Sequence, residues 1–558
     1  MFGAHFVLAV VLSVSSVSIT EPVDGEVYSG NWLSVRAIVE NENVLPDSVH
    51  YSLNGGSVVV IPRLNTDWPT YMQNDMKHGF SESPAPMDNS ILWSAPVTGD
   101  AHEFPTPVVV DGIVYYPQDS TGDSLYALDA ATGSILWTYK TGYTDDAVTV
   151  VDGFLYTASD SIWCLDALTG ERIWASGVAN SNGSTPSVVN GSVYCGTTFW
   201  PSNTSKVYSL DASSGEINWV ISVTGITASC NTVWEGVVYL PTYRGGLYAL
   251  DAESGVLLWS NNDSYQGYWD SSPVIVDGMI YIGGNDGNIR CVNPDNGITV
   301  WEQAITPSTY IAATLAYADG KLYFGDQETS YHCINAADGS NVWTVPGVEH
   351  GSSGIADGVV FFGEGSNYYD ESARVFAFDC ETGAEIWSYS TTSGPYGIVS
   401  SPSIVDGVMY IAGTDWNLYA FGTGLKYTFL DDLYAEVGSN ELIVTSWFSG
   451  TAVAADTISF TVTGTGIDLE PSRVFNLAVS PNPVVTSAAV SFQLAEPGRT
   501  SVKIYDLTGR AVCSLVDSDL SAGLHSFEWS GEDQAAGLYL CSINSGGVIE
   551  FTGLCLLK

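Results

Sequence analysis

The sequence predicts an all-β fold in which one four-stranded unit recurs around a ring, and three observations lead to this prediction. The first is a phrase that runs from an apolar strand through a Thr-Gly turn to a tryptophan. In its first copy, residues 125–129 alternate as in a strand, Gly133 can adopt the positive φ of a turn, and Trp137 can fill the gap between units. Seven copies, which indicate a repeat architecture, lie at 125–137, 162–174, 207–219, 247–259, 289–301, 331–343 and 375–387.

The second observation is an Asp-Gly or Asn-Gly pair between two apolar strands. Such a pair is the strongest short hairpin signal, because both turn residues take a positive φ. Each unit therefore has four strands, called A to D here, with an A–B hairpin at this pair and a C–D hairpin at the Thr-Gly phrase. The pair, in which Glu235 fits least well, occurs at Asp111-Gly112, Asp152-Gly153, Asn190-Gly191, Glu235-Gly236, Asp277-Gly278, Asp319-Gly320, Asp357-Gly358 and Asp406-Gly407.

The third observation is the spacing of the tryptophans, which are 37 to 45 residues apart from Trp93 to Trp387. This is the spacing of β-propeller blades. The last unit, 401–421, has strands A to C but lacks its tryptophan strand, while the strand around Trp93 has no unit of its own. The sequence thus predicts an eight-bladed β-propeller whose ring closes where residues 90–97 pair with residues 417–421.

The repeats at 67–424 resemble the pyrroloquinoline-quinone-like (PQQ-like) β-propeller repeats of quinoprotein dehydrogenases and of the outer-membrane assembly propeller lipoprotein. Residues 67–80 resemble the lead-in that precedes such propellers. The resemblance implies the fold and does not carry an activity, because one fold hosts many functions.

The segments on either side of the repeats look like two halves of one immunoglobulin-like domain. Residues 19–64 contain a Pro-x-Asp-Gly opening and a Tyr-Ser-Leu-Asn-Gly hairpin, but they are too short for a whole sandwich. Residues 425–464 contain the Gly-x-Asn-x-Leu and Phe-Thr-Val phrases of the back half. We therefore expect one sandwich that is interrupted by the whole propeller.

The last segment, 475–558, follows a linker at 465–474 and predicts a second immunoglobulin-like β-sandwich. It resembles the C-terminal sorting domain of the type IX secretion system, and equally the immunoglobulin-like module of flagellar hook-capping proteins. Its terminal position, its Pro481-Asn482-Pro483 opening and its Leu556-Leu557-Lys558 ending favour the sorting domain. This resemblance implies a bacterial protein that the outer-membrane secretion machinery releases or attaches at the cell surface.

Residues 1–18 resemble a secretory signal peptide, because an apolar run is followed by small residues. The run is not preceded by Lys or Arg, and the alternative interpretation is an N-terminal strand. No later stretch approaches the length of a membrane-spanning helix. We expect a monomer that is secreted or exposed at the cell surface.

Charge and cysteine content exclude several classes of function. The chain has 62 acidic and 16 basic residues, a formal charge of −46, which argues against nucleic-acid and anionic-lipid partners. Its nine cysteines include no C-x-x-C pair. Cys164, Cys291 and Cys333 fall at equivalent strand positions and are expected to pack as small apolar residues.

No catalytic or metal-binding motif emerges from the chain. The family resemblance implies that a quinoprotein dehydrogenase needs a cofactor floor, a calcium site and a catalytic Asp, often with adjacent cysteines, and no such arrangement is found. Asp286-Gly287-Asn288 is interpreted as a strand turn, since EF-hand spacing is missing. We expect no cofactor, PQQ and calcium included, and a non-catalytic binding or scaffold module. The alternatives are a PQQ-dependent dehydrogenase of alcohols or sugars and a structural surface-layer component.

Strand alternation predicts where a ligand would bind. A–B and C–D turns share one face of the propeller, which should be flat, whereas B–C and D–A loops share the other. Variable loops on a rigid scaffold usually carry function. Acids and aromatic rings in the D–A loops favour a cation, a glycan or another neutral ligand, or a protein ligand; the alternative is that the rings plug the channel. The candidate ligand-binding residues are His102, Glu103, Asp145, Asp146, Tyr268, Trp269, Asp270, Tyr310, Glu349, His350 and Tyr396.

Overall fold

The structure is a computed structural model, and every regular element that it describes is a β-strand. The described residues are 16–24, 26–28, 32–41, 48–54, 58–61, 63–74, 76–97, 105–118, 124–142, 147–178, 184–197, 203–227, 229–262, 267–268, 271–305, 310–311, 313–326, 330–346, 352–364, 374–391, 400–413, 415, 417–434, 438–448, 451–462, 474–480, 487–494, 498–506, 511–530, 537–545 and 548–556.

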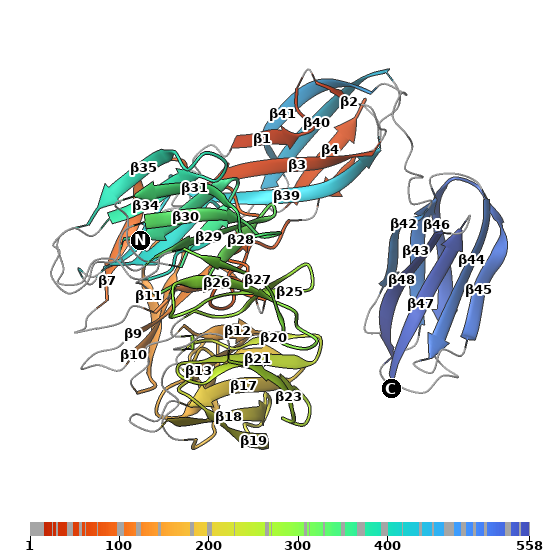
Figure 1. Ribbon diagram of the computed structural model, residues 1–558. Coiled ribbons are helices and arrows are strands. Elements are labelled where there is room, and N and C mark those ends of the chain that lie inside the picture. Colours follow the sequence, from red (N-terminus) through yellow and green to blue (C-terminus); the bar gives the residue numbers. More distant parts are fainter. Residues whose placement is uncertain are drawn as a thin grey trace, which may run out of the picture. The chain divides into compact units, whose positions relative to one another are not determined.

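Eight of the described sheets carry the repeat, and we number them in chain order (Figure 1). Sheets 1 to 4 consist of β8 (Val108–Val110), β9 (Ile113–Gln118), β10 (Ser124–Asp129) and β11 (Ile135–Lys140); β12 (Thr149–Val151), β13 (Phe154–Ala158), β14 (Ile162–Asp166) and β15 (Arg172–Ala175); β16 (Ser187–Val189), β17 (Ser192–Thr197), β18 (Thr204–Asp211) and β19 (Ile217–Thr224); and β20 (Thr232–Trp234), β21 (Val237–Thr242), β22 (Gly246–Asp251) and β23 (Leu257–Asn261).

Sheets 5 to 8 follow the same order of strands A to D. They consist of β24 (Val274–Val276), β25 (Met279–Gly283), β26 (Asn288–Val292) and β27 (Thr299–Ala304); β28 (Ala316–Ala318), β29 (Lys321–Gly325), β30 (Ser330–Asn335) and β31 (Asn341–Pro346); β32 (Gly354–Ala356), β33 (Val359–Gly363), β34 (Arg374–Asp379) and β35 (Glu385–Ser390), with β6 (Phe80–Ser81) added beside β32; and β36 (Ser403–Val405), β37 (Val408–Ala412), β38 (Asn417–Phe421) and β7 (Ile91–Pro96).

The A strands form the inner ring of the fold. Each one contacts the A strand of the next sheet, and β36 of sheet 8 contacts β8 of sheet 1, so the cycle is closed. The expected closing strand is confirmed, because β7 pairs antiparallel with β38 and places Trp93 opposite Ala420. Residues more than 300 positions apart in the chain thus complete one sheet, and the ring is propeller-like.

The two hairpins of each unit form as expected. All eight A–B turns have positive φ at both central residues, from 46° at Glu235 to 79° at Gly153, so even the poorest match adopts the turn. In the C–D turn of sheet 1, the Asp129 carboxylate accepts hydrogen bonds from the backbone N–H and the hydroxyl of Thr132, at 2.8 and 2.7 Å. Short side-chain hydrogen bonds of this kind favour a turn over a continuing strand.

The tryptophan of each D strand joins its sheet to the next one. Its indole N–H donates to a backbone carbonyl at 2.7–3.2 Å in all eight cases, seven times in the C–D turn of the following sheet and, for Trp387, at Pro86 ahead of β7. Seven of the rings lie against the turn glycine of that sheet, as Trp219 lies against Gly255. The expectation that tryptophan fills the gap between units is confirmed. The three equivalent cysteines are also buried as expected.

The segments that flank the repeats pair with each other. One sheet has the order β1-β3-β39 and the other has the order β2-β41-β40-β4-β5, so each sheet combines strands from before and after the repeats (Figure 1). Residues 48–53 lie opposite residues 442–447. The immunoglobulin-like class of this domain stays a prediction. The strands are β1 (Ser16–Glu21), β2 (Val27–Tyr28), β3 (Trp32–Asn41), β4 (Ser48–Leu53), β5 (Val59–Ile61), β39 (Leu425–Tyr434), β40 (Gly438–Phe448) and β41 (Thr451–Val462).

The signal peptide predicted at residues 1–18 stays a prediction. Residues 16–18 belong to β1 and pair with residues 38–40, and Val17 is buried. The N-terminal strand that was the alternative interpretation therefore begins inside the predicted segment. Residues 1–15 lie outside the described residues.

The chain divides into two compact units. The first contains the repeats and most of the flanking strands, and the second contains the last strands. The last strands form the sheets β42-β43-β46 and β45-β44-β47-β48 around a core that includes Val490, Phe492, Ile504 and Trp529. These strands are β42 (Val474–Ser480), β43 (Ser487–Leu494), β44 (Gly498–Asp506), β45 (Ala511–Leu520), β46 (Gly523–Ser530), β47 (Gly537–Ser545) and β48 (Val548–Leu556).

Two turn glycines with similar backbones provide a test of the contact between sheets. Gly255 has φ +71° and a Cβ there would lie 2.7 Å from the Trp219 ring, whereas Gly278 has φ +69° and open space around it. We expect Gly278→Ala to cost about 1–2 kcal/mol through backbone strain alone. Gly255→Ala should cost about 1–3 kcal/mol more, because the added methyl displaces the indole. Urea unfolding measures both values, and equal costs would contradict the structural role given to this contact.

Candidate functional site

Most of the candidate residues from the sequence lie outside the described residues. These are His102, Glu103, Asp145, Asp146, Trp269, Asp270, Glu349, His350 and Tyr396. Their assignment to a ligand-binding face stays a prediction. The two described candidates are Tyr268 and Tyr310, and the structure places them differently.

Tyr268 is not the exposed aromatic residue that we expected. Its side chain is fully buried in a cluster with Tyr239, Leu247 and Ile275, so it packs between sheets 4 and 5. Tyr310 is 45% exposed and is accessible to a ligand. An aromatic residue in a loop next to a buried inner strand can either pack between sheets or remain exposed to a ligand. The surrounding side chains decide which of the two occurs.

Residues 66–83, which we call the axial segment, run along the inner strands of the ring. The segment forms backbone hydrogen bonds with the middle residue of five different A strands. Trp68 exchanges two with Val109, at 2.7 and 2.9 Å. The N–H groups of Val150, Ile275, Tyr317 and Ile355 donate to carbonyls of the segment at 2.7–3.0 Å. The segment thus satisfies inward-pointing amides of sheets 1, 2, 5, 6 and 7, which would otherwise need water or a ligand.

Tyr71 lies at the centre of the axial segment. Its ring packs against one apolar cluster from sheets 1 and 2 and against another from sheets 6 and 7, so it spans the axis of the ring. Its hydroxyl is 2.8 Å from the Ser352 hydroxyl. Burial raises the pKa of Tyr71 to about 12, although hydrogen bonds to Ser352, Thr314 and Ser401 oppose the shift. Tyr71 is therefore a neutral hydrogen-bonding residue at physiological pH.

Small side chains, which we call the collar, occupy one equivalent position in all eight sheets, and Ser352, Thr314 and Ser401 among them form hydrogen bonds with this hydroxyl. Each lies three residues before the middle of an A strand, where the D–A loop ends. The backbone N–H groups of Cys230, Ser272 and Thr314 donate to the collar hydroxyls of the next sheets at 2.9–3.1 Å. The collar residues are Thr106, Ala147, Thr185, Cys230, Ser272, Thr314, Ser352 and Ser401. The collar contributes inter-sheet hydrogen bonds, and it cannot be recognised in the sequence because single Ser and Thr residues carry no motif.

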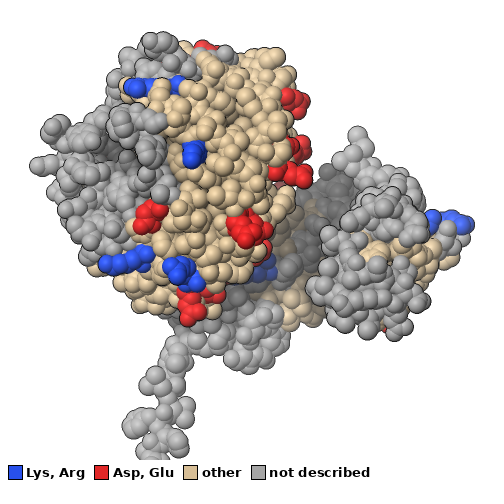
Figure 2. Space-filling model, turned by 90° about the horizontal axis from the view of Figure 1, so that it is seen from below, with Lys and Arg blue, Asp and Glu red and all other residues tan. Residues whose placement is uncertain are grey.

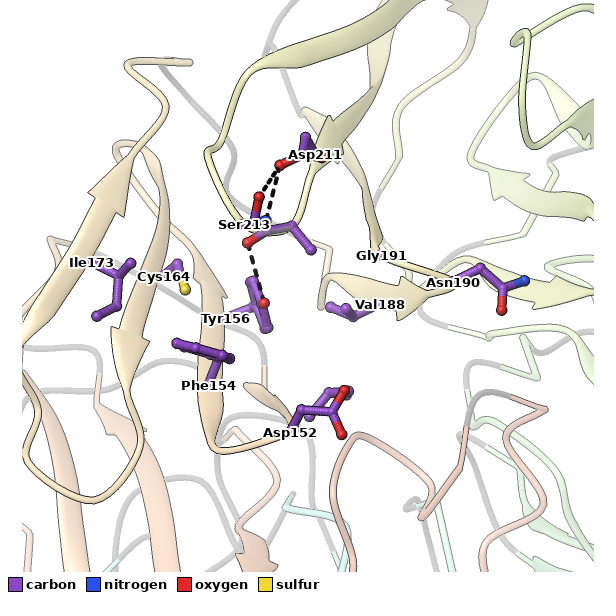
Figure 3. A pocket seen from close by; sticks show the side chains of 12 residues that line it. Asp152, Phe154, Tyr156, Cys164, Ile173, Val188, Asn190, Gly191, Asp211 and Ser213 are labelled. Carbon is purple, nitrogen blue, oxygen red and sulfur yellow. Dashed lines mark hydrogen bonds between the residues drawn. The ribbon is translucent and has the colours of Figure 1, made fainter. Parts of the chain in front are cut away.

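A hollow of about 650 Å³ lies between sheets 2 and 3, on the face formed by the A–B and C–D turns. In Figure 3, Tyr156 points toward the turn of the next sheet that carries Ser213 and Asp211, and Phe154 and Asp152 lie on the other side of Tyr156. The Tyr156 hydroxyl donates to the Ala212 carbonyl at 3.3 Å and closes the inner end. We expected this face to be flat, and that expectation is wrong at this position.

The electrostatics of the described surface suit neither phosphate nor a clustered metal site. On the face in Figure 2, basic side chains lie as small separate groups among acidic ones. The described residues include no group of three or more His, Cys, Asp or Glu side chains that could hold a metal ion. Asp286, the possible oxygen ligand, instead pairs with the buried Arg290 through two hydrogen bonds of 2.6 and 2.9 Å.

Fold and repeats together define a β-propeller of the PQQ-like repeat type. A family model described as outer membrane protein assembly factor BamB matches residues 85–154, 158–313 and 285–424, which is more than half of the chain. The chain therefore belongs to this family. No curated protein matches the sequence. In the described part of the chain, no helix is long and apolar enough to cross a membrane.

Solved structures of alcohol and methanol dehydrogenases share the fold. The quinohemoprotein alcohol dehydrogenase ADHIIG from Pseudomonas putida HK5 is 15% identical, with a TM-score of 0.52 over 66% of this chain and 80% of its own. The quinohemoprotein alcohol dehydrogenase of Comamonas testosteroni is 16% identical, with a TM-score of 0.51 over 67% and 82%. A europium-containing methanol dehydrogenase is 13% identical, with a TM-score of 0.52 over 66% and 98%. At these identities the likeness concerns the fold alone.

The described residues do not fit a quinone on the axis at the level of the inner strands. A bound cofactor needs a concave site, and the central channel is the concavity that a propeller offers. Here the axial segment fills that level of the channel with Tyr71 and with the fully buried side chains of Trp68 and Met72. The adjacent cysteine pair of many quinoproteins is also missing from the chain.

Because the axial segment joins five sheets, loss of its packing contacts should destabilise the whole ring. Trp68 is fully buried and its backbone pairs with Val109. We expect Trp68→Ala to lower the free energy of unfolding by about 3–5 kcal/mol, since it leaves a large cavity.

The control is Trp68→Phe, which keeps most of the volume and should cost clearly less. Urea unfolding followed by circular dichroism measures both variants. Near-wild-type stability of Trp68→Ala would contradict the structural role of the segment.

Proposed function

We propose that this protein is a non-catalytic binding or scaffold module built on an eight-bladed β-propeller. The observation that carries this proposal is the axial segment. In a propeller that binds a cofactor, the channel must offer space and polar groups to that cofactor. In this chain the amides of five inner strands and the centre of the ring are used by the protein's own residues 66–83.

The contacts that fix the propeller to the flanking sheets also support a scaffold role. The chain enters the ring after residue 63 and leaves it before residue 426, and both crossings make contacts. Arg63 pairs with Asp406 at 2.6 Å, and the Thr66 hydroxyl donates to the same carboxylate at 2.9 Å. Lys426 pairs with Glu40 of β3 at 3.0 Å. Two anchored crossings hold the ring against the flanking sheets, which we interpret as one immunoglobulin-like domain with the propeller inserted in it.

We further propose that the chain acts outside the cytoplasm as a monomer and that its last domain is a sorting module for the outer-membrane secretion machinery. The sequence features at both ends support this proposal, together with the acidic surface that keeps extracellular proteins soluble. A purely structural role in a surface layer is the second candidate. A specific ligand would favour the binding role.

The quinone-dependent dehydrogenase is the alternative that the likeness to solved enzymes favours. We expect the purified chain, after incubation with PQQ and calcium and then desalting, to retain no quinone and to reduce no dye with alcohols or sugars. A quinohemoprotein alcohol dehydrogenase treated in the same way is the positive control. Stoichiometric retention of the quinone with substrate-dependent dye reduction would replace our proposal.

Cell fractionation tests the location. We expect the native chain in the medium or at the cell surface, with its leader cleaved before Ser16 so that β1 stays intact. A chain that ends at residue 474 should accumulate in the periplasm, because it lacks the sorting module. Native protein that remains in the cytoplasm with residues 1–15 attached would contradict the proposal.

A further inference from the structure

The turn face of the propeller repeats one groove between successive sheets. Each groove lies between the A–B turn of one sheet and the C–D turn of the next, and the two turns mostly supply one acidic residue each. The grooves differ at two positions. One is the first residue of strand B, directly after the A–B turn, and the other is the third residue of the facing C–D turn.

At the groove between sheets 8 and 1, the A–B turn binds an arginine of the chain itself. The A–B turn residue Asp406 binds Arg63 at 2.6 Å, and the Arg63 guanidinium lies 4.9 Å from the centre of the Tyr427 ring. Burial, and then the charge of Asp406, raise the pKa of Tyr427 to about 12. Asp129 of the facing C–D turn raises the pKa further, whereas Arg63 lowers it. Asp406 and the Tyr427 ring thus hold one guanidinium, and the second turn aspartate, Asp129, acts on the same ring.

Between sheets 6 and 7, the same groove is bridged by an ion pair. Lys321 is the first residue of β29, and its ammonium group lies 2.6 Å from the carboxylate of Glu381 in the facing turn. The pair spans the groove, so a side chain from another protein would have to break it. The two positions therefore decide whether the groove is bridged.

Between sheets 2 and 3, the groove is open and presents the same chemical groups. Asp152 and Asp211 are the turn aspartates, equivalent to Asp406 and Asp129. Phe154 takes the first position of strand B and is 39% exposed, and the facing turn residue is only Ser213. Ile173, 48% exposed, extends the apolar wall. Figure 3 shows Phe154 beside Asp152, with Ser213 across the hollow.

We propose that this hollow binds an arginine side chain of a partner protein, with the guanidinium over Phe154 and between Asp152 and Asp211. A planar cation stacks well on an aromatic ring and pairs with carboxylates. Asp211 is held as a carboxylate, because hydrogen bonds from Ser213 and Ser214 lower its pKa. The formal charge of −46 would also attract a basic partner over a distance. The inference deepens the proposed function by naming the ligand class, and it rests on that function.

The test follows the methyl signal of Ile173 by NMR in the full chain while N-acetyl-arginine amide is added. The signal is assigned with an Ile173→Val variant. We expect a saturable shift with half-saturation at about 1–10 mM, as a single charged contact allows. N-acetyl-citrulline amide has the same shape without the charge and should cause no saturable shift.

Substitutions of single residues in the hollow measure how much each side chain contributes to binding of the arginine amide. Phe154→Ala should weaken the arginine amide about threefold to tenfold, since the stacking ring is lost. Asp152→Asn should weaken it about tenfold and keep the turn, because Asn190 forms the same turn in the next sheet with φ 51°. Phe154→Lys with Ser213→Glu brings in the ion pair seen between sheets 6 and 7 and should abolish binding.

Asp319→Asn is the matched control for net charge. Asp319 has the same turn position as Asp152 but borders the groove that Lys321 and Glu381 bridge. The affinity of the Asp319→Asn variant for the arginine amide should equal that of the wild type. Circular dichroism confirms that each variant is folded.

Three outcomes would overturn the proposal: no shift of Ile173, an equal shift with the citrulline compound, or an equal loss in Asp319→Asn and Asp152→Asn. None of them bears on quinone binding or on secretion, which are measured separately. Failure of this site and failure of the proposed function can therefore be told apart.

Discussion

The whole ring depends on one contact, in which the tryptophan of each D strand packs on the following sheet. No repeat sheet can bury its apolar faces alone. Each sheet therefore packs against its neighbour through surfaces of complementary shape. The glycine of the Thr-Gly turn has no Cβ, which lets the indole approach closely, and the indole N–H finds a carbonyl in the same turn. At sheet 8 the chain has no such turn, and the Pro86 carbonyl accepts the Trp387 N–H instead. The closing joint therefore uses the same interaction as the others.

Closure of the ring has a cost at its centre, where the inner strands present polar amides toward the axis. In this protein the axial segment pairs with five of those strands, and hydroxyl groups of the collar accept hydrogen bonds between the sheets. At the level of the inner strands, the centre of the ring is therefore occupied by the protein's own packed and hydrogen-bonded residues.

The turn face shows how a repeated backbone produces grooves of different character. An arginine binds the A–B turn at the groove between sheets 8 and 1, an ion pair bridges the groove between sheets 6 and 7, and the groove between sheets 2 and 3 is open. The backbones are alike, since the A–B turns share their φ values. Two side chains per groove decide whether the groove is bridged or open. A repeat protein can therefore acquire a binding site through as few as two substitutions.

The sequence by itself determined the parts of this protein that rest on local physics repeated many times. Glycine and aspartate in the turns, strand alternation and regular tryptophans predicted the four-stranded units and the closing role of β7, because each copy reports the same local preference. Only the tertiary structure decided what residues 66–83 do, since one irregular segment has no sister copy to compare. It also decided that Tyr268 is buried and that the groove beside Phe154 is open. Burial depends on what neighbouring sheets place opposite a side chain, and that information is spread over residues far apart in the chain.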